Sequence, residues 1–300
     1  MAVAEMETGA PIVKDGRAFS EPFGSTIEDP GSSGRPWLLK GKKMGMCAIV
    51  PSYNAGTTMR LLLEKLISYS PSIVVVDDGS EDDTASVARG FARQGVVLLQ
   101  HHENLGKGAA LRSGFLWAIE QGFEVVVTLD SDLQHAPEDL PGIVEVFEGE
   151  GLDMLVGSRT HDNRGMPKIR RFGNRFSSWI ATRFCCQSIQ DSQCGYRLYR
   201  LASCKSILMN LTSRRFEAET EILVMGANER LRIGFAPITV IYPENGSHKS
   251  HYRGFWDTSL IIWFYTKEFC RRVWARWGSQ DEPVSKGKGG HLRDNSDIAC

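Results

Sequence analysis

Several features that would assign this sequence to a familiar class of proteins are missing from it. No apolar stretch approaches the roughly 20 residues that a membrane-spanning helix needs. The N-terminus carries acidic residues where a secretory signal has a basic region and an apolar core. The seven cysteines form no CxxC pair and show no zinc-ligand spacing, a pattern typical of reduced intracellular proteins. We therefore expect a cytoplasmic protein that is soluble or touches the cytoplasmic membrane face peripherally.

An excess of one charge is also absent, because 35 basic residues balance 36 acidic ones. No overall field favours nucleic acid, so we expect no nucleic-acid partner and only local anion binding. Neither the GxxxxGK[ST] loop nor the GxGxxG fingerprint occurs, which removes the main support for an ATPase or a dehydrogenase.

The chain is divided by composition into a central domain and two tails. Residues 1–43 and 279–300 are rich in Gly, Ser and charge without apolar periodicity, and both are predicted to be flexible. Residues 44–250 alternate short Val/Ile/Leu runs, from MCAIVP to DMLVGSR, with helical patterns. Continuous apolar strands separated by helices predict an α/β fold, Rossmann-like, with a mainly parallel sheet flanked by helices.

Residues 251–278 are predicted to form an amphipathic helical segment. Trp263, Cys270, Trp274 and Trp277 fall on one helical stripe, and basic residues are interleaved with them. Such a stripe suits a helix at a lipid surface, and it equally suits a helix packed on the domain.

Two carboxylates follow the apolar run VVVTL, in the segment TLDSDLQH. Carboxylates one residue apart repel each other and usually persist where a cation or donor array neutralises them. Asp130, Asp132 and Gln134 together offer three oxygen ligands, which suits Mg²⁺ or Mn²⁺ with water and phosphate completing the shell. A helix N-cap leading into Pro137 would explain one of the two aspartates only.

Polar groups also follow the other apolar runs, where parallel sheets collect their ligands. In VVVDDGS, Asp78 suits a hydrogen bond to a nucleobase or ribose, or equally the cap of a tight turn. In NLGKGAA, Lys107 and small residues open a helix, which could present backbone N–H groups and one positive charge to a phosphate.

Six motifs in this order, PSYNAG, VVVDDGSEDDT, NLGKGAALRSG, TLDSDLQH, VGSR and QDSQCGYRLYR, resemble the inverting family-2 glycosyltransferases of the GT-A fold. The similarity is greatest to the dolichyl-phosphate and polyprenyl-phosphate glucosyl- or mannosyltransferases. It covers about Cys47 to Arg200 and continues more weakly to about Lys267. The resemblance implies metal-dependent transfer of a hexose from a UDP- or GDP-sugar to a polyprenyl phosphate at the cytoplasmic membrane face.

The resemblance also implies roles for residues at matching positions. The expected nucleotide-sugar contacts are Pro51, Tyr53, Asn54, Asp78, Lys107, Asp130 and Asp132, with Asn54 standing where many members have Glu. The expected metal ligands are Asp130, Asp132 and Gln134. The expected acceptor-binding residues are Arg159, Arg170, Asn174 and Arg175, although the basic stretch also suits a solvated helix face. The expected catalytic residues are Asp132, Arg159 and Asp191, and Glu219 or Glu221 is expected to orient an arginine.

Other functions remain open from the sequence. A phosphate monoester is already an anionic nucleophile, whereas a glycan or small-molecule hydroxyl would need a general base, for which Asp191 is the candidate. A nucleotidyltransferase would need a Gly-rich opening where PSYNAG stands. A non-catalytic nucleotide-sugar-binding protein would have no need of both Asp130 and Asp132.

Overall fold

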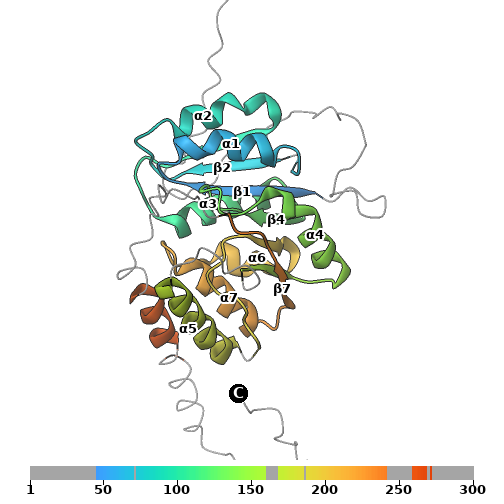
Figure 1. Ribbon diagram of the computed structural model, residues 1–300, viewed down its shortest axis with the longest axis vertical. Coiled ribbons are helices and arrows are strands. Elements are labelled where there is room, and N and C mark those ends of the chain that lie inside the picture. The colour runs from blue at the N-terminus through green and yellow to red at the C-terminus, as the bar shows by residue number, and fades with distance from the viewer. Residues whose placement is uncertain are drawn as a thin grey trace, which may run out of the picture.

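A seven-stranded sheet with the order β3-β2-β1-β4-β6-β5-β7 organises the protein (Figure 1). The computed structural model describes residues 45–70, 72–159, 168–185, 187–241, 259–268 and 271. The tails predicted over 1–43 and 279–300 lie outside the described residues. The strands are β1 (Met46–Ser52), β2 (Ile73–Asp77), β3 (Val96–Gln100), β4 (Val125–Thr128), β5 (Met154–Ser158), β6 (Arg197–Arg200) and β7 (Ile233–Pro237).

The sheet is mostly parallel, as the apolar runs predicted. Strand β1 pairs in parallel with β2 and β4, β2 pairs in parallel with β3, and β5 pairs in parallel with β7. Strand β6 is antiparallel to both of its neighbours, β4 and β5. Neither β6 nor β7 was predicted from the sequence. Since all the other strands share one direction, β1, β2, β4 and β5 end at the same edge of the sheet.

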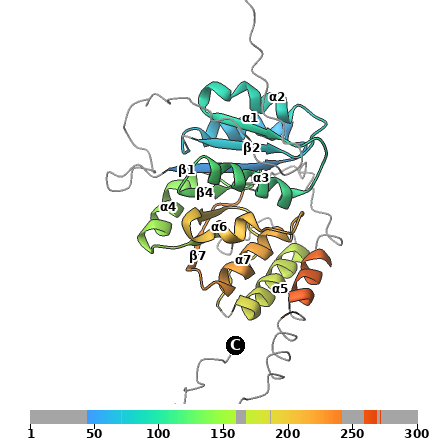
Figure 2. The same cartoon turned by 180° about the vertical axis from the view of Figure 1, so that it is seen from behind.

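Helices cover the sheet and are joined to it by short loops. They are α1 (Gly56–Leu66), α2 (Thr84–Gly90), α3 (Lys107–Glu120), α4 (Leu140–Gly149), α5 (Lys168–Cys185), α6 (Leu201–Met209) and α7 (Ala218–Asn228), with short 3₁₀ turns at Ala92–Gln94 and Pro137–Asp139. Helices α3, α6 and α7 pack against one another, and α5 packs against α7 (Figure 2). Residues 259–268 are helical, within the segment predicted as amphipathic. No helix in the described part of the chain has the length and apolar content required to cross a bilayer.

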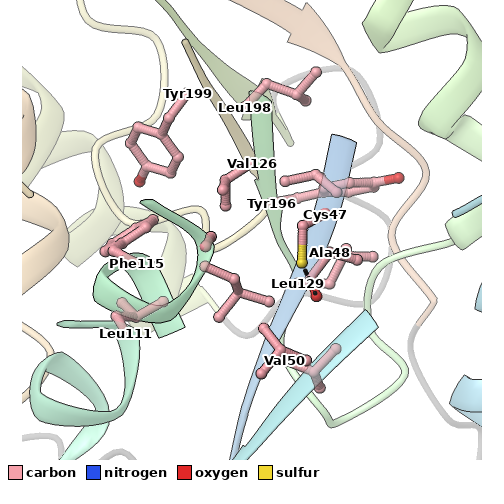
Figure 3. Close-up of a cluster of buried hydrophobic side chains, with 14 of the residues drawn as sticks. Cys47, Ala48, Val50, Leu111, Phe115, Val126, Leu129, Tyr196, Leu198 and Tyr199 are labelled. Atoms are coloured by element: carbon pink, nitrogen blue, oxygen red, sulfur yellow. Dashed lines mark hydrogen bonds between the residues drawn. The ribbon is translucent and has the colours of Figure 1, made fainter. Parts of the chain in front are cut away.

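The core covers both faces of the central strands, and the part that includes Leu111 and Phe115 of α3 is drawn in Figure 3. All residues of β1, β2 and β4 are buried, which explains why their sequences read as unbroken apolar runs. Phe115 of α3 meets Tyr199 of β6 edge to face, with ring centroids 5.2 Å apart. A Cβ on Gly114 would lie 2.5 Å from Cγ2 of Ile49, so this glycine lets α3 approach β1 closely.

One buried carboxylate joins three parts of the fold. Asp153, just before β5, accepts hydrogen bonds from Ser203 Oγ on α6 at 2.6 Å and from the backbone N–H of Arg232, just before β7, at 2.9 Å. Burial would raise the pKa of Asp153, but the bonds from Ser203 and Arg232 lower it below the usual value. A carboxyl with a depressed pKa contributes stability above its unfolded pKa and loses that contribution as pH falls through the folded value.

We therefore expect Asp153→Asn to lower the free energy of unfolding at pH 7 by about 1–3 kcal/mol, the cost of leaving buried donors poorly matched. The deficit should shrink as pH falls from about 4, the usual pKa of an aspartate, through the lower folded value, because the unfolded wild-type chain then binds a proton and the advantage of the native carboxylate is lost. Thermal melts across pH 3–7 measure both effects. Glu145→Gln, on the exposed side of α4, is the control and should melt like the wild type at pH 7. A deficit of equal size at pH 3 and pH 7 would contradict the assignment.

Candidate functional site

The turn after β4 carries the two aspartates of TLDSDLQH to the edge of the sheet. Leu129 N–H still donates to Ile49 O at 3.1 Å, so the strand geometry persists up to Asp130. Asp132 Oδ1 accepts the N–H of Gln134 at 3.0 Å, and Leu133 has φ 60°, a left-handed conformation that is uncommon for leucine. Thr58 Oγ1 of α1 donates to Ser131 O at 2.6 Å and holds the turn in place. Asp130, Asp132 and Gln134 are half-buried side chains on this turn.

A partly buried ion-pair network connects this turn to two helices. Lys107, the first residue of α3, places its Nζ 2.6 Å from Asp130 Oδ1 and 3.0 Å from Oε1 of Glu219 on α7. Burial alone would favour the neutral forms, but the attraction between the groups raises the pKa of Lys107 and lowers the pKa of Asp130. Lys107 therefore stays protonated and Asp130 stays ionised around neutral pH.

The loop of the QDSQCG motif lies directly against Asp130. A Cβ on Gly195 would stand 2.5 Å from Oδ2 and 2.7 Å from Oδ1 of Asp130, so only glycine leaves the carboxylate its place. Thr128 Oγ1 donates to Gly195 O at 2.8 Å and fixes the loop to the end of β4. The position of this carboxylate thus depends on the absence of a side chain at residue 195.

Arg159, at the exit of β5, is held by Asp191 through a two-point ion pair. Arg159 Nε lies 2.6 Å from Asp191 Oδ2, and Nη2 lies 2.8 Å from Oδ1. Asp191 is 1% exposed and also accepts the N–H of Gln193 at 3.0 Å. A carboxylate occupied in this way positions a guanidinium, and it would have to leave this pair to act as a general base.

A second arginine, Arg197, holds the same loop through hydrogen bonds to its backbone. Its role was not predicted from the sequence. Arg197 of β6 is completely buried and donates to three backbone carbonyls: Cys194 O at 2.6 Å, Glu219 O at 2.7 Å and Ser192 O at 2.9 Å. It therefore joins the QDSQCG loop to the first turn of α7. The signal in the sequence was its place two residues before Tyr199, which puts both side chains on the buried face of one strand.

Glu219 and Glu221 have other partners than the arginine side chain expected for one of them. The Glu219 carboxylate pairs with Lys107. Glu221 accepts the backbone N–H of Thr212 at 3.1 Å and that of Ser213 at 2.7 Å. The hydrogen bond that joins Glu219 to an arginine is made by its backbone carbonyl, which accepts from Arg197, and the Glu219 carboxylate helps to raise the pKa of that arginine.

Asp78 holds the start of α3 in place. Its 2% exposed carboxylate accepts the N–H groups of Leu105 at 3.0 Å and Gly106 at 2.7 Å, and it lies 2.6 Å from Nδ1 of His101. Both carboxylate oxygens of Asp78 accept hydrogen bonds from the protein. A contact of Asp78 with a base or ribose stays a prediction.

The glycines of NLGKG make room for protein backbone. A Cβ on Gly106, which has φ 101°, or on Gly108 would stand 2.4 Å from the carbonyl oxygen of Arg214 or Ser213, respectively. Ala109 N–H donates to Arg214 O at 3.2 Å. The first turn of α3 thus packs on the 213–214 loop, and a contact of Lys107 and the nearby backbone N–H groups with a phosphate stays a prediction.

The remaining predicted donor contacts follow β1. Pro51 is buried within the strand and Tyr53 is half-buried just after it. Asn54 adopts φ 49°, accepts the N–H of Glu81 at 2.9 Å through its side chain, and donates its own N–H to Ser80 Oγ at 2.9 Å. Asn54 thereby fixes the turn after β2 beside the end of β1.

The predicted acceptor residues are divided between two elements. Arg159 lies close enough to Asp130 to lower the pKa of that carboxyl, so it shares the neighbourhood of the carboxylate turn. Arg175 is exposed on α5, while the side chains of Arg170 and Asn174 lie outside the described residues. The structure thus brings Lys107, Asp130, Asp132, Arg159 and Asp191 into one region, with α5 beside it.

His135 and Cys194 form a buried pair behind the carboxylate turn. His135 Nε2 lies 3.7 Å from Cys194 Sγ, and its ring lies against Tyr196 with centroids 5.6 Å apart. Burial lowers the pKa of His135 despite the nearby carboxylates of Asp130 and Asp132, so the imidazole is neutral at pH 7. It therefore supplies no positive charge to a bound phosphate.

The oxygen donors of the turn suit a cation that is shared with a ligand. Within the described ranges, no three His, Cys, Asp or Glu side chains are placed to hold a metal ion by themselves. Mg²⁺ and related ions are commonly bound by one or two carboxylates together with substrate phosphates. Asp130 and Asp132, with Gln134 beside them and Gly195 leaving space at Asp130, fit that manner of binding.

Comparison with known proteins shows the family of the chain. The model of the family "Glycosyl transferase family 2" matches residues 47–208, more than half of the chain. The UDP-N-acetylglucosamine–dolichyl-phosphate N-acetylglucosaminyltransferase of Methanococcus voltae is 29% identical over 77% of this chain and 95% of its own. The undecaprenyl-phosphate mannosyltransferase of Micrococcus luteus is 29% identical over 69% of this chain and 87% of its own.

Among solved structures, the glucosyl-3-phosphoglycerate synthase of Mycobacterium tuberculosis, in complex with Mn²⁺, UDP and glucosyl-3-phosphoglycerate, has a similar fold. The TM-score is 0.58 at 17% sequence identity, and the match covers 79% of this chain and 84% of that one. The mostly parallel sheet with its flanking helices is therefore of the GT-A type predicted from the sequence.

Proposed function

Since the chain belongs to glycosyl transferase family 2 and is a glycosyltransferase, we propose that it moves a hexose from a UDP- or GDP-sugar to a polyprenyl phosphate. The observation that carries the proposal is the convergence of Asp130, Lys107 and the Arg159–Asp191 pair on one edge of the sheet. The two named relatives differ in the sugar that their names state, so the sugar is proposed only as a hexose or its derivative.

The donor side of the site is built to hold a diphosphate. Asp130, Asp132 and Gln134 would hold a divalent cation, Mg²⁺ or Mn²⁺, which neutralises the charge that develops on the departing nucleoside diphosphate. Lys107 orients Asp130, and Glu219 balances the charge of Lys107, so the carboxylate stays ionised and fixed before any ligand arrives. A preorganised carboxylate avoids the cost of reorganisation during the reaction.

The acceptor side needs a positioned cation and no strong base. A phosphate monoester oxygen attacks the anomeric carbon as the bond from that carbon to the diphosphate oxygen breaks on the opposite face, which inverts the configuration. Asp191 holds Arg159 through Nε and Nη2 and so fixes the plane of the guanidinium. A fixed guanidinium can orient an incoming phosphate, and the occupied state of Asp191 favours this acceptor over a hydroxyl that would need a base.

The donor half of the proposal is tested by thermal unfolding. Mn²⁺ alone is expected to change the melting temperature little, because no closed protein site exists among the described side chains. Mn²⁺ with UDP or GDP in large excess over Kd should stabilise by about 2–3 kcal/mol, which corresponds to a rise of roughly 5 °C or more. Asp132→Asn, of equal size, should abolish that rise, and an undiminished rise would contradict the role of Asp132.

The acceptor half is tested by transfer of a labelled sugar. Product should appear in the organic phase when polyprenyl phosphate is supplied and should be absent with the unphosphorylated polyprenol. Transfer to a polyprenol, a glycan or another hydroxyl, with none to the lipid phosphate, would instead support the hydroxyl-transferring alternative. In that case Asp191→Asn should remove the general base and abolish turnover.

A further inference from the structure

Exposed apolar side chains gather on two neighbouring helices, α5 and the helix at 259–268. Trp179 of α5 is 57% exposed, and the ring of Phe176, 47% exposed, lies parallel to it with centroids 6.1 Å apart. On the second helix, Trp263 is 66% exposed and Ile262 is 48% exposed. Half of the exposed large hydrophobic residues among the described side chains are on these two helices: Leu61, Leu105, Met209 and Ile241 are elsewhere. We call Phe176, Trp179, Ile262 and Trp263 the aromatic surface.

The two helices form one anchored unit. Both views show the orange-red helix at 259–268 beside α5 (Figures 1 and 2). The rings of Phe184 on α5 and Tyr265 lie 5.0 Å apart between centroids, and Ile261 and Tyr265 are buried. The second helix thus packs against the protein through Ile261 and Tyr265, while Ile262 and Trp263 are exposed. The two tryptophans are therefore exposed although the helices that carry them are packed against the rest of the protein.

Among the side chains that the structure describes on these two helices, the exposed charged ones are all basic. Helix α5 has five basic residues and no acidic one: its sequence is KIRRFGNRFSSWIATRFC. Arg183 places its guanidinium 5.8 Å from the ring of Trp179. On the other helix Lys267 is exposed, and the only carboxylate, Glu268, is 6% exposed and pairs with Arg271 at 2.7 Å. An approaching partner therefore meets aromatic rings and positive charge.

We propose that the aromatic surface docks onto an anionic lipid bilayer, with Trp179 and Trp263 in the headgroup region. Tryptophan combines an apolar ring with one N–H donor, which suits the boundary between headgroups and acyl chains, and interleaved arginine and lysine attract anionic lipid. The choice of a bilayer rests on the proposed lipid-phosphate acceptor. Helix α7, on which α5 packs, carries Glu219 of the ion-pair network, so docking here would present the acceptor side of the site to the membrane.

Co-sedimentation of the full chain with vesicles tests the surface without any catalytic step. The wild type should pellet with phosphatidylcholine vesicles that contain about one third phosphatidylglycerol, and much less with phosphatidylcholine alone, because the cations contribute. The double variant Trp179→Ser/Trp263→Ser should bind the anionic vesicles at least tenfold more weakly. The matched control, Leu61→Ser/Met209→Ser, removes two other exposed large apolar residues, from α1 and α6, and should bind like the wild type.

A charge variant gives an independent measurement of the same surface. Arg183→Gln/Lys267→Gln should weaken binding to the anionic vesicles and leave the weak binding to neutral vesicles unchanged. Equal binding of the wild type and both double variants would overturn the proposal. So would a wild-type dimer in sedimentation velocity that the tryptophan variant dissociates without any vesicle binding, because the surface would then bind a second copy of the chain.

The outcome can be separated from that of the proposed function. The tryptophan variant should keep the wild-type melting temperature and the stabilisation by Mn²⁺ with nucleotide. It should transfer sugar to a water-soluble short prenyl phosphate at the wild-type rate. With long-chain polyprenyl phosphate in vesicles, its transfer rate should be at least tenfold lower than that of the wild type. If the wild type transfers to neither acceptor yet pellets as expected, the proposed function fails and the docking surface stands.

Discussion

Gly195→Ala is expected to reduce sugar transfer by at least about 100-fold, because a displacement of about 1 Å at a reacting centre can cost that much. The added Cβ would stand 2.5 Å from Oδ2 of Asp130, well inside van der Waals contact. Either the carboxylate or the loop must move, and the loop is held by the Thr128 hydrogen bond to Gly195 O at 2.8 Å. The carboxylate is therefore expected to be displaced.

The measurement pairs a steady-state assay with thermal unfolding. Gly195→Ala should also lose the stabilisation by Mn²⁺ with nucleotide, which reports on the same carboxylate without catalysis. Gly142→Ala is the control, since a Cβ on this exposed α4 residue meets nothing within 4 Å and glycine in a helix interior is destabilising by roughly 0.5–1 kcal/mol relative to alanine. It should retain full activity and melt slightly higher. Wild-type activity in Gly195→Ala would show that Asp130 is not needed where it lies.

Arg197→Met is expected to lower the free energy of unfolding by about 3–5 kcal/mol, the range seen when one partner of a buried charged interaction is removed. The substitution fills a similar volume but leaves the carbonyls of Ser192, Cys194 and Glu219 without their donor. For a domain of this size the melting temperature should fall by roughly 10 °C or more. Circular dichroism melts and urea titrations measure the loss.

Two companion variants show whether geometry or charge is responsible. Arg197→Lys keeps the charge but cannot donate to three carbonyls at once, so most of the loss should remain. Arg200→Met removes a neighbouring arginine of the same strand that is 28% exposed and pairs with Glu148, and it should cost about 1 kcal/mol or less. Similar losses for Arg197→Met and Arg200→Met would contradict the special role of Arg197.

The parallel half of the fold and the edge that bears the site were predictable from local pattern. MCAIVPS, IVVVD and VVVT are buried at every position and almost wholly apolar because both faces of the central strands are covered, and the helices between them force the strands into one direction. The polar residues that follow these runs had to meet at one edge. The strand RLYR was missed because Arg197 interrupts its apolar pattern, although that arginine is fully buried.

Candidate residues for the site could be chosen from the sequence, whereas their partners could not. The closeness of Asp130 and Asp132 could be inferred from the sequence, and their mutual repulsion indicates a cation nearby. Gly195, by contrast, lies within the motif QDSQCGYRLYR, where nothing local marks it as different from a turn glycine. Its function became visible when the space for its missing side chain proved to be occupied by the Asp130 carboxylate.

The residue types along the chain, by themselves, determined a parallel sheet with helices over it and an acidic turn at its carboxyl edge, because burial and chain direction follow from short-range periodicity. Tertiary structure alone decided which charges are neutralised by which partners. Lys107 and Glu219 are 112 positions apart and Arg159 and Asp191 are 32 apart, and no local rule relates them. Coulomb attraction between such groups depends on their distance in space and on their burial, and the packing of α3, α7 and the QDSQCG loop sets both.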